Sequence, residues 1–385
     1  MKQDKKIVIW GAGSEAIRFV LLHNKNEFSF CIDSYKRNEK EFLGMPLYSP
    51  EEAKRYSIDF IVVATSENAY QEIRALLIKE GKKEFRDFGY YSFYKKKVAV
   101  LYGNCFTGPI KEGLRTNERF NKEYGIYPLP YIHVLANKNE LVDASILKNC
   151  DLFIHQSVRK ENEFGEKYSS IHLIQSLRKG CNIIAIPNLN RMPTCFFPNN
   201  NFVDGGGNFI EGMSYFPFRD SFIDQRYMGG GSSKDILYAI NEEDIIERGK
   251  IRKALDLFIN KVAKREKGWD IHISDWIIEN YRKKQLFYDG NHPTEYVVNY
   301  VCNKLIEALG FSGGVVYEYS TKMDALEVPI YGQVKRELGL NYSSDVMRRY
   351  SGNSLSRSPI TTYEYVDQYI KWNLEWNHNR DDNNG

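Results

Sequence analysis

One pattern constrains the fold of this sequence at two places: an apolar strand that runs into a glycine turn and then directly into a helix. The first is "KKIVIWGAGSEA" at residues 5–16, and the second is "VAVLYGNCFTGPIKEGL" at residues 98–114. After each, short apolar strands alternate with helical stretches, which is typical of parallel sheets with right-handed crossovers. The 385 residues are enough for two or three domains. We therefore predict an α/β protein with a domain starting at each glycine turn.

The predicted domain boundaries lie where these patterns begin and end. Residues 1–95 are expected to form a Rossmann-like domain with a parallel sheet, residues 96–345 a second α/β domain rich in helices, and residues 346–385 a C-terminal extension. Between 196 and 235, two Gly-Gly-Gly runs and many aromatic residues replace the helical patterns, which predicts an irregular segment. This segment could cap a site, or it could be a surface insertion with local aromatic packing.

Composition excludes several classes of function. The 53 Lys and Arg residues are balanced by 50 Asp and Glu residues and are scattered, so nucleic acid is not an expected partner. The sequence has no apolar run of membrane-spanning length and no signal-peptide pattern at its start, so we expect a cytoplasmic protein. Six cysteines without CxxC spacing predict reduced thiols and no metal site. The sequence is compatible with a homo-oligomer.

The N-terminal glycine turn has the spacing of a dinucleotide-binding motif. Gly11, Gly13 and Ala16 form GxGxxA after a strand, and Asp33 stands where a ribose-binding acid belongs. A tight strand-to-helix connection requires the same glycines, however. The sequence also lacks a convincing catalytic Tyr-x-x-x-Lys element near this domain, which argues against an NAD-dependent oxidoreductase.

Residues 5–90 as a whole resemble the sugar-binding N-terminal domain of PglD-type acetyltransferases. The resemblance rests on "IVIWGAG", "FCIDSYKRNEKEFLGMPLYSPEE" and "DFIVVAT". It implies that Gly11, Gly13 and Asp33 contact a nucleotide-linked sugar. A purely structural role for this domain is the alternative.

Cys105 stands at the tip of the second glycine turn, between a strand and a helix. Ligands of open α/β sheets bind at this edge, and the amides of a helix N-terminus there stabilise negative charge. Thr107 can cap the helix, and Pro109 fits its first turn. The position favours a thiolate nucleophile, whereas a buried strand-end cysteine is the structural alternative.

A base for such a nucleophile is found in "LFYDGNHPTEYVV", where Asp289 lies three residues before His292. Across a loop, this spacing lets the carboxylate reach Nδ1 of the imidazole while Nε2 faces outward. Asp289 could instead only cap the turn. The order of the motifs resembles the SGNH (GDSL-type) hydrolase fold, which places Cys105 at the nucleophile, Asp289 at the acid and His292 at the base of a triad.

A closer resemblance, over about residues 97–345, is to the WcbI family of polysaccharide-biosynthesis acetyltransferases. It rests on residues 103–105 of "YGNCF" and residues 291–293 of "GNHP", although Phe106 stands where the family has Gln. The resemblance implies that the chain uses acetyl-CoA, and that its acceptor is a capsule sugar linked to a nucleotide or a lipid.

The resemblance also implies roles for individual residues. Cys105 would be the nucleophile or would contact the acyl group, and His292 would deprotonate the thiol or the acceptor hydroxyl. The backbone N–H of Cys105 would stabilise the oxyanion together with Gln156, for which Asn104 and Asn188 are alternatives. Coenzyme A would contact Gly103, Asn188 and Arg159. Its phosphates have several further candidate partners, which are Lys111, Arg115, Lys160, Arg191 and Arg219.

The leading hypothesis is therefore an acetyl-CoA-dependent acetyltransferase that acts on a sugar of a capsular or other surface polysaccharide precursor. One alternative is an SGNH-type thioesterase or carbohydrate deacetylase, because the same triad can pass an acyl group to water. Another is a non-catalytic scaffold that holds a nucleotide sugar at "GAGSEA".

Overall fold

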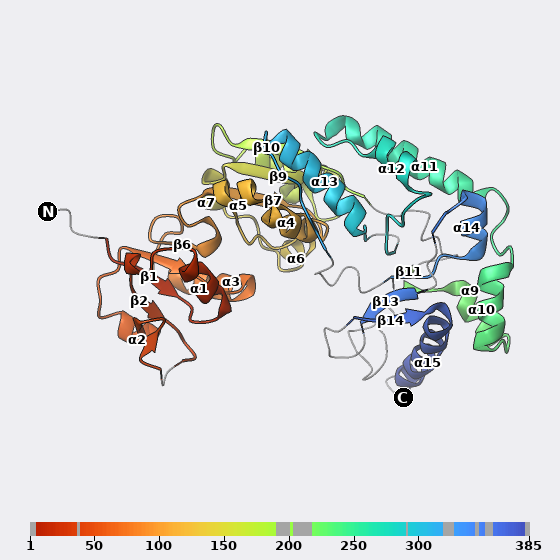
Figure 1. Ribbon diagram of the computed structural model, residues 1–385, viewed down its shortest axis with the longest axis horizontal. Coiled ribbons are helices and arrows are strands. Elements are labelled where there is room, and N and C mark those ends of the chain that lie inside the picture. The colour runs from red at the N-terminus through yellow and green to blue at the C-terminus, as the bar shows by residue number, and fades with distance from the viewer. Residues whose placement is uncertain are drawn as a thin grey trace. The chain divides into compact units, whose positions relative to one another are not determined.

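The computed structural model describes residues 5–36, 39–189, 201–202, 218–289, 292–318, 327–342, 346–350 and 357–381. The protein has the predicted α/β fold (Figure 1). It divides into two compact units. The first contains Met1–Thr107 and Glu118–Ile184, and the second contains Gly108–Asn117 and Ala185–Gly385.

A six-stranded sheet near the N-terminus has the strand order β3-β4-β2-β1-β5-β6. Its strands are β1 (Ile7–Trp10), β2 (Phe28–Ile32), β3 (Glu41–Phe42), β4 (Met45–Tyr48), β5 (Phe60–Val63) and β6 (Phe88–Tyr90). Its helices are α1 (Ser14–Leu21), α2 (Pro50–Ala53) and α3 (Glu67–Lys79). Only the β3–β4 pair is antiparallel. Successive residues of β1 point to opposite faces of the sheet, and Val8 and Ile9 belong to two different buried clusters. Both faces of this strand are therefore covered.

A four-stranded sheet with the order β10-β9-β7-β8 follows along the chain. Its strands are β7 (Lys97–Tyr102), β8 (Tyr124–Ile126), β9 (Leu152–Gln156) and β10 (Asn182–Ile186). Between these strands, the first unit contains the helices α5 (Glu118–Glu123), α6 (Ile132–Asn137), α7 (Ala144–Lys148) and α8 (Ser170–Ile174). The central strand β7 pairs in parallel with β8 and β9. The carboxyl ends of these strands therefore lie at one edge of the sheet.

The two sheets pack against each other within the first unit. Tyr127 donates its hydroxyl to Glu84 at 3.0 Å, and Gln71 Nε2 donates to the carbonyl of Pro128 at 2.7 Å. The strands change from one sheet to the other between residues 90 and 97, close to the expected boundary at 95. Packing joins the two sheets in one compact unit, and the expected domain division at residues 95 and 345 stays a prediction.

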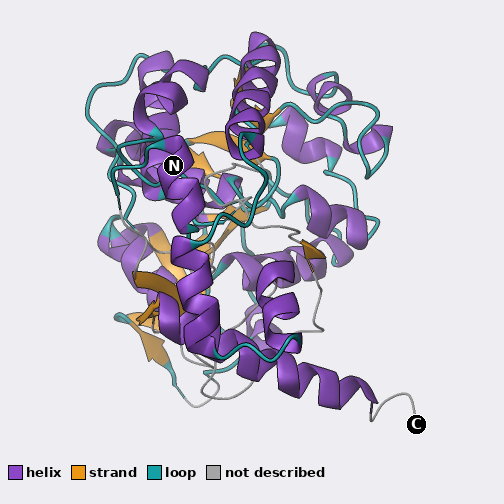
Figure 2. Ribbon diagram, turned by 90° about the vertical axis from the view of Figure 1, so that its right-hand side faces the viewer, coloured by secondary structure: helices purple, strands orange, loops and turns teal. Residues whose placement is uncertain are grey.

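The second unit is built mainly from helices (Figure 2). They are α4 (Thr107–Thr116), α9 (Ser221–Met228), α10 (Ser233–Glu242), α11 (Lys250–Arg265), α12 (Ser274–Asn280), α13 (Glu295–Ala308), α14 (Gly332–Leu338) and α15 (Thr362–Asp381). Two short strand pairs accompany them, β11 (Asn201–Phe202) with β12 (Phe218–Arg219) and β13 (Val346–Tyr350) with β14 (Arg357–Thr361).

The expected C-terminal extension takes part in the packing of this unit. Helix α15 contacts α9 and α10 and buries Tyr365, Val366 and Tyr369. Tyr369 donates its hydroxyl to Asp224 at 2.8 Å. Within the described part of the chain, no helix is both long and apolar enough to cross a membrane.

Candidate functional site

The turn that carries Cys105 is held by its own polar groups. Strand β7 ends at Tyr102 and helix α4 begins at Thr107, so the expected position of Cys105 between a strand and a helix is confirmed. Asn104 Oδ1 accepts the N–H of Phe106 at 3.0 Å, and the Asn104 carbonyl accepts the N–H and the hydroxyl of Thr107 at 3.0 and 2.9 Å. Such asparagine turns fix a chain that reverses direction. Cys105 is partly exposed and free of disulfides.

Gln156 reaches this turn from the carboxyl end of β9. Its Oε1 accepts the backbone N–H of Asn104 at 2.8 Å, and its side chain is buried. The approach requires a glycine at position 103, because a Cβ on Gly103 would lie 2.4 Å from Gln156 Oε1. Gln156 therefore positions the turn through its oxygen, so only its Nε2 could donate to an oxyanion.

Asp289 and His292 form the pair that their spacing predicts. Asp289 Oδ2 lies 2.5 Å from His292 Nδ1, and Oδ1 accepts the backbone N–H of His292 at 2.9 Å. The Asp289 side chain is 2% exposed and that of His292 18%. Backbone bonds close the loop, because Tyr288 N–H donates to the His292 carbonyl at 2.8 Å. Asp289 thus caps the turn and orients the imidazole, and its role as the acid of a triad stays a prediction.

A histidine that donates from Nδ1 to a carboxylate carries its lone pair on Nε2, the atom that a general base uses. Helix α13 begins at Glu295, three residues after His292. Asn291, which the WcbI resemblance includes, lies outside the described residues.

Residues 314–318 connect α4 and α13 within the second unit. Along α4, the segment meets the helix from its end toward its start. Asn117 Nδ2 lies 3.5 Å from the Gly314 carbonyl, and Val316 N–H donates to Thr116 Oγ1 at 3.1 Å. Glu318 and Glu112 line one hollow. The segment also binds α13, through bonds from Val315 N–H to Asn303 Oδ1 at 2.9 Å and from Tyr317 N–H to Asn299 Oδ1 at 2.7 Å. The segment therefore runs antiparallel to α4 and antiparallel to α13. The two helices consequently run parallel to each other.

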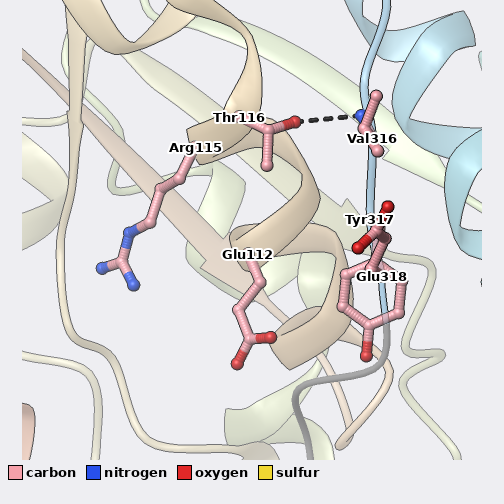
Figure 3. A pocket seen from close by; sticks show the side chains of 6 residues that line it. All are labelled: Glu112, Arg115, Thr116, Val316, Tyr317 and Glu318. Atoms are coloured by element: carbon pink, nitrogen blue, oxygen red, sulfur yellow. Dashed lines mark hydrogen bonds between the residues drawn. The ribbon is translucent and has the colours of Figure 1, made fainter.

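This hollow of about 550 Å³ contains one of the cationic residues considered for coenzyme A. Figure 3 shows Arg115 and Glu112 projecting from α4, with the segment 316–318 beside the helix. Its lining consists of Glu112, Arg115, Thr116, Val316, Tyr317 and Glu318. Two carboxylates accompany the single guanidinium, which does not favour a phosphate. Arg115 therefore gains no support as a coenzyme A contact.

The remaining candidate contacts have different surroundings. Asn188, just after β10, has a buried Oδ1 without a hydrogen-bond partner in the described part of the chain. Arg159 is exposed, and Lys160 pairs with Glu166 at 3.1 Å. Arg191 lies outside the described residues, and Arg219 is described only through its backbone in β12. Lys111 on α4 is half-buried.

Half of the expected irregular segment 196–235 lies outside the described residues. Where it is described, residues 221–228 form the regular helix α9. The expectation of an irregular segment is wrong there. Asp220 caps this helix by accepting the N–H groups of Phe222 and Ile223 at 3.0 and 3.2 Å.

The N-terminal glycine turn has a structural explanation. Gly11 has φ of +123°, and a Cβ there would lie 2.4 Å from the Ala64 carbonyl oxygen. Asp33 Oδ2 accepts the N–H of Ala12 at 2.9 Å, and Oδ1 accepts those of Tyr35 and Lys36. These contacts support the structural alternative, because both carboxylate oxygens already serve the backbone. Contact of Gly11, Gly13 and Asp33 with a nucleotide-linked sugar stays a prediction.

These parts define an α/β protein whose candidate groups are a cysteine at a strand-to-helix turn and an Asp–His pair ahead of a second helix. A family model described as polysaccharide biosynthesis enzyme WcbI matches residues 98–314. The match covers more than half of the chain, so the chain belongs to the WcbI family of polysaccharide biosynthesis enzymes.

Other comparisons concern the fold and the N-terminal region. A solved structure of WcbI, described as the native protein without a disulfide bond between coenzyme A and a cysteine, matches with a TM-score of 0.54 and 20% identity. The match covers 73% of this chain and 89% of that one, and it shows a shared fold. Residues 3–86 match a family model described as C2185-like, N-terminal. No curated protein matches the chain.

Proposed function

We propose that this protein transfers an acetyl group from acetyl-CoA to a sugar of a capsular or other surface polysaccharide precursor. The observation that carries the proposal is the Asp289–His292 pair, whose Oδ2···Nδ1 separation is 2.5 Å. Membership in the WcbI family supports a role in polysaccharide biosynthesis. The solved WcbI structure, whose description names coenzyme A and a cysteine, supports the donor.

The parallel direction of α4 and α13 supports a joint role for Cys105 and His292. Cys105 precedes the first residue of α4 by two positions, and His292 precedes the first residue of α13 by three. The proposed reaction requires the thiol and the imidazole to meet at one site, and the shared direction of the two helices is compatible with this requirement. Backbone N–H groups at the start of α4 would then face the negative charge that develops there.

In the proposed reaction, His292 Nε2 takes the proton of the Cys105 thiol, and Asp289 holds the resulting imidazolium. The thiolate attacks the thioester carbonyl, the backbone N–H of Cys105 binds the oxyanion, and the thiol of coenzyme A leaves with the proton from His292. His292 next deprotonates a sugar hydroxyl, which attacks the acyl-cysteine and regenerates the thiol. If the sugar attacks acetyl-CoA directly, His292 keeps its role as base and Cys105 lines the site.

Asn188 has a buried side-chain oxygen that coenzyme A could satisfy. Its buried Oδ1 has no hydrogen-bond partner within the described residues, and a buried acceptor without a donor costs about 1–3 kcal/mol. The pantetheine arm of coenzyme A contains amide N–H groups that could donate to it. This match supports the donor assignment and makes Asn188 the first coenzyme A contact to test.

The experiment for this proposal combines isothermal titration with coenzyme A and intact-protein mass spectrometry after mixing with acetyl-CoA. We expect binding, and a mass gain of one acetyl group in the wild type that is lost in Cys105→Ala. Binding without an adduct, but with coenzyme A released when a sugar nucleotide is added, would indicate direct transfer. Release without any sugar would favour the thioesterase alternative, and absence of binding would contradict the donor assignment.

A further inference from the structure

Two thiols outside the candidate site meet at the amino edge of the four-stranded sheet. Cys150 lies just before β9, and Cys181 lies just before β10, the neighbouring strand. Their sulfur atoms are 3.7 Å apart. The backbone N–H of Asn182 donates to the carbonyl of Asp151 at 2.9 Å, so the two cysteines flank a ladder hydrogen bond.

This geometry is suited to a disulfide bond. Neighbouring strands lie about 4.8 Å apart, and the Cα atoms of a disulfide are typically about 4.4–6.8 Å apart. Side-chain rotation can therefore bring the sulfur atoms from 3.7 Å to the bonded distance of about 2.05 Å.

The two thiols differ in chemistry. Cys150 is fully buried, and its hydrogen bond with Cys181, together with burial, raises its pKa. Cys181 is half-buried, and its hydrogen bond with Cys150 lowers its pKa. Arg178 also lowers the pKa of Cys181, whereas burial and Asp151 raise it. Arg178 is held nearby by an ion pair with Asp151 at 2.9 Å. Cys181 is therefore the better nucleophile and Cys150 the protonated partner.

We propose that Cys150 and Cys181 form a thiol–disulfide exchange site that reacts with small disulfides such as oxidised glutathione. The thiolate of Cys181 attacks one sulfur of the small disulfide and releases the other half as a thiol, which leaves a mixed disulfide on Cys181. Cys150 then attacks the Cys181 sulfur, and its proton goes to the second departing thiol. The protein dithiol is oxidised by two electrons, and the small disulfide is reduced to two thiols.

This site is separate from Cys105. The Val98 N–H at the start of β7 donates to Asp151 Oδ2 at 2.8 Å, so the pair lies at the amino end of that strand. Cys105 follows the carboxyl end of the same strand, which spans six residues, or about 20 Å. Modification of one site can thus be followed without the other.

The test incubates the full chain with oxidised glutathione and locates the products by peptide mass spectrometry. We expect a crosslinked pair of peptides with Cys150 and Cys181, and a mass lower by two hydrogen atoms. Cys150→Ser should stop at a stable glutathione adduct on Cys181. Cys181→Ser should leave Cys150 unmodified, and Cys105→Ser should crosslink as the wild type does.

Cys302 provides an internal control for unfolding, because it is fully buried in α13. It should stay unmodified in every sample that is counted. An adduct on Cys181 that persists in the wild type without a crosslink would overturn the proposal. So would reaction of Cys150 in Cys181→Ser, or the absence of any product at Cys181.

Discussion

Asp289 binds His292 through both oxygens of its carboxylate, one on the backbone N–H at 2.9 Å and the other on Nδ1 at 2.5 Å. The first contact fixes the loop, and the second fixes the tautomer of the imidazole. Because the two contacts use different oxygen atoms, loop geometry and acid–base function can be separated by substitution.

The substitution Asp289→Asn tests the second contact. The asparagine would keep an oxygen for the backbone N–H of His292, but its NH₂ group would face Nδ1. Because NH₂ is a donor, the imidazole would have to carry its proton on Nε2 instead of Nδ1. We expect kcat for acetyl transfer to fall by about 10²–10⁴, with little change in thermal unfolding.

Asp270→Asn is the matched control. Asp270 also accepts a backbone N–H, that of Ala185 at 2.6 Å, and belongs to the same unit. Its substitution should leave kcat near the wild-type value. Equal losses in the two variants would contradict a specific role for Asp289.

Gln156→Met tests whether Gln156 positions the turn before α4. The variant keeps the volume but removes the acceptor of the Asn104 N–H, which leaves a donor unsatisfied at a cost of about 1–3 kcal/mol. We expect a clear loss of kcat, because the backbone around Cys105 would no longer be held. Steady-state kinetics and urea unfolding measure the two effects.

Gln333→Met serves as the comparison for Gln156→Met. Gln333 is likewise buried and accepts a backbone N–H, that of Ile246 at 2.8 Å. We expect a similar loss of stability with kcat retained. If both variants lose kcat in proportion to stability, Gln156 has only a structural role.

The N-terminal glycines should respond differently to alanine. Gly11→Ala forces a side chain at φ +123° and 2.4 Å from a carbonyl oxygen, so we expect a loss of about 2 kcal/mol or more. Gly13 has φ of −103° and open space around its Cβ position, so Gly13→Ala should cost about 0.5 kcal/mol or less. Urea unfolding measures both. Equal effects would contradict the structural account of Gly11.

The sequence was informative wherever local chemistry decides the structure. The Asp289–His292 contact followed from a three-residue spacing in a loop, and the placement of Cys105 from an apolar strand, a glycine and a helical pattern. The positioning contact of Gln156 could not be read in this way, because it joins residues 52 positions apart. Residues 103–105 predict the turn, but they do not predict that Gln156 at the end of β9 supports it.

Packing between elements also escaped the sequence. The sequence predicted a C-terminal extension but not that Tyr365 and Tyr369 of α15 are buried, with α15 packed against α9 and α10. The C-terminal region is mostly polar, so the narrow apolar stripe of α15 that contains Tyr365, Val366 and Tyr369 was not recognised. The coupling of α4 to α13 depends on Thr116 and Asn117, polar residues at a helix end whose partners lie about 200 positions away.

Asp220 should make the stability of the second unit depend on pH. Burial raises its pKa to about 6 in the folded protein, from 3.8 for an unperturbed aspartate. Between these values the folded state holds more protons than the unfolded state, so the free energy of unfolding should fall as pH rises from about 4 to 6. The total change is on the order of 3 kcal/mol.

Asp220→Asn keeps an oxygen for the N–H groups of Phe222 and Ile223 and removes the titration. Urea unfolding at several pH values should therefore show a weaker fall in the variant than in the wild type. Asp275→Asn, at an exposed position of α12, should keep the wild-type slope. An unchanged slope in Asp220→Asn would contradict the assignment.

If Cys105 and His292 act at one site, as proposed, His292 should control the rate at which iodoacetamide alkylates Cys105 at neutral pH. Peptide mass spectrometry would follow Cys105 in the wild type and in His292→Ala, with Cys181 in the same samples as the reference thiol. If His292 takes the proton of the thiol, alkylation of Cys105 should slow about tenfold or more in the variant, while Cys181 reacts unchanged. Equal rates at Cys105 in the two proteins would contradict the account.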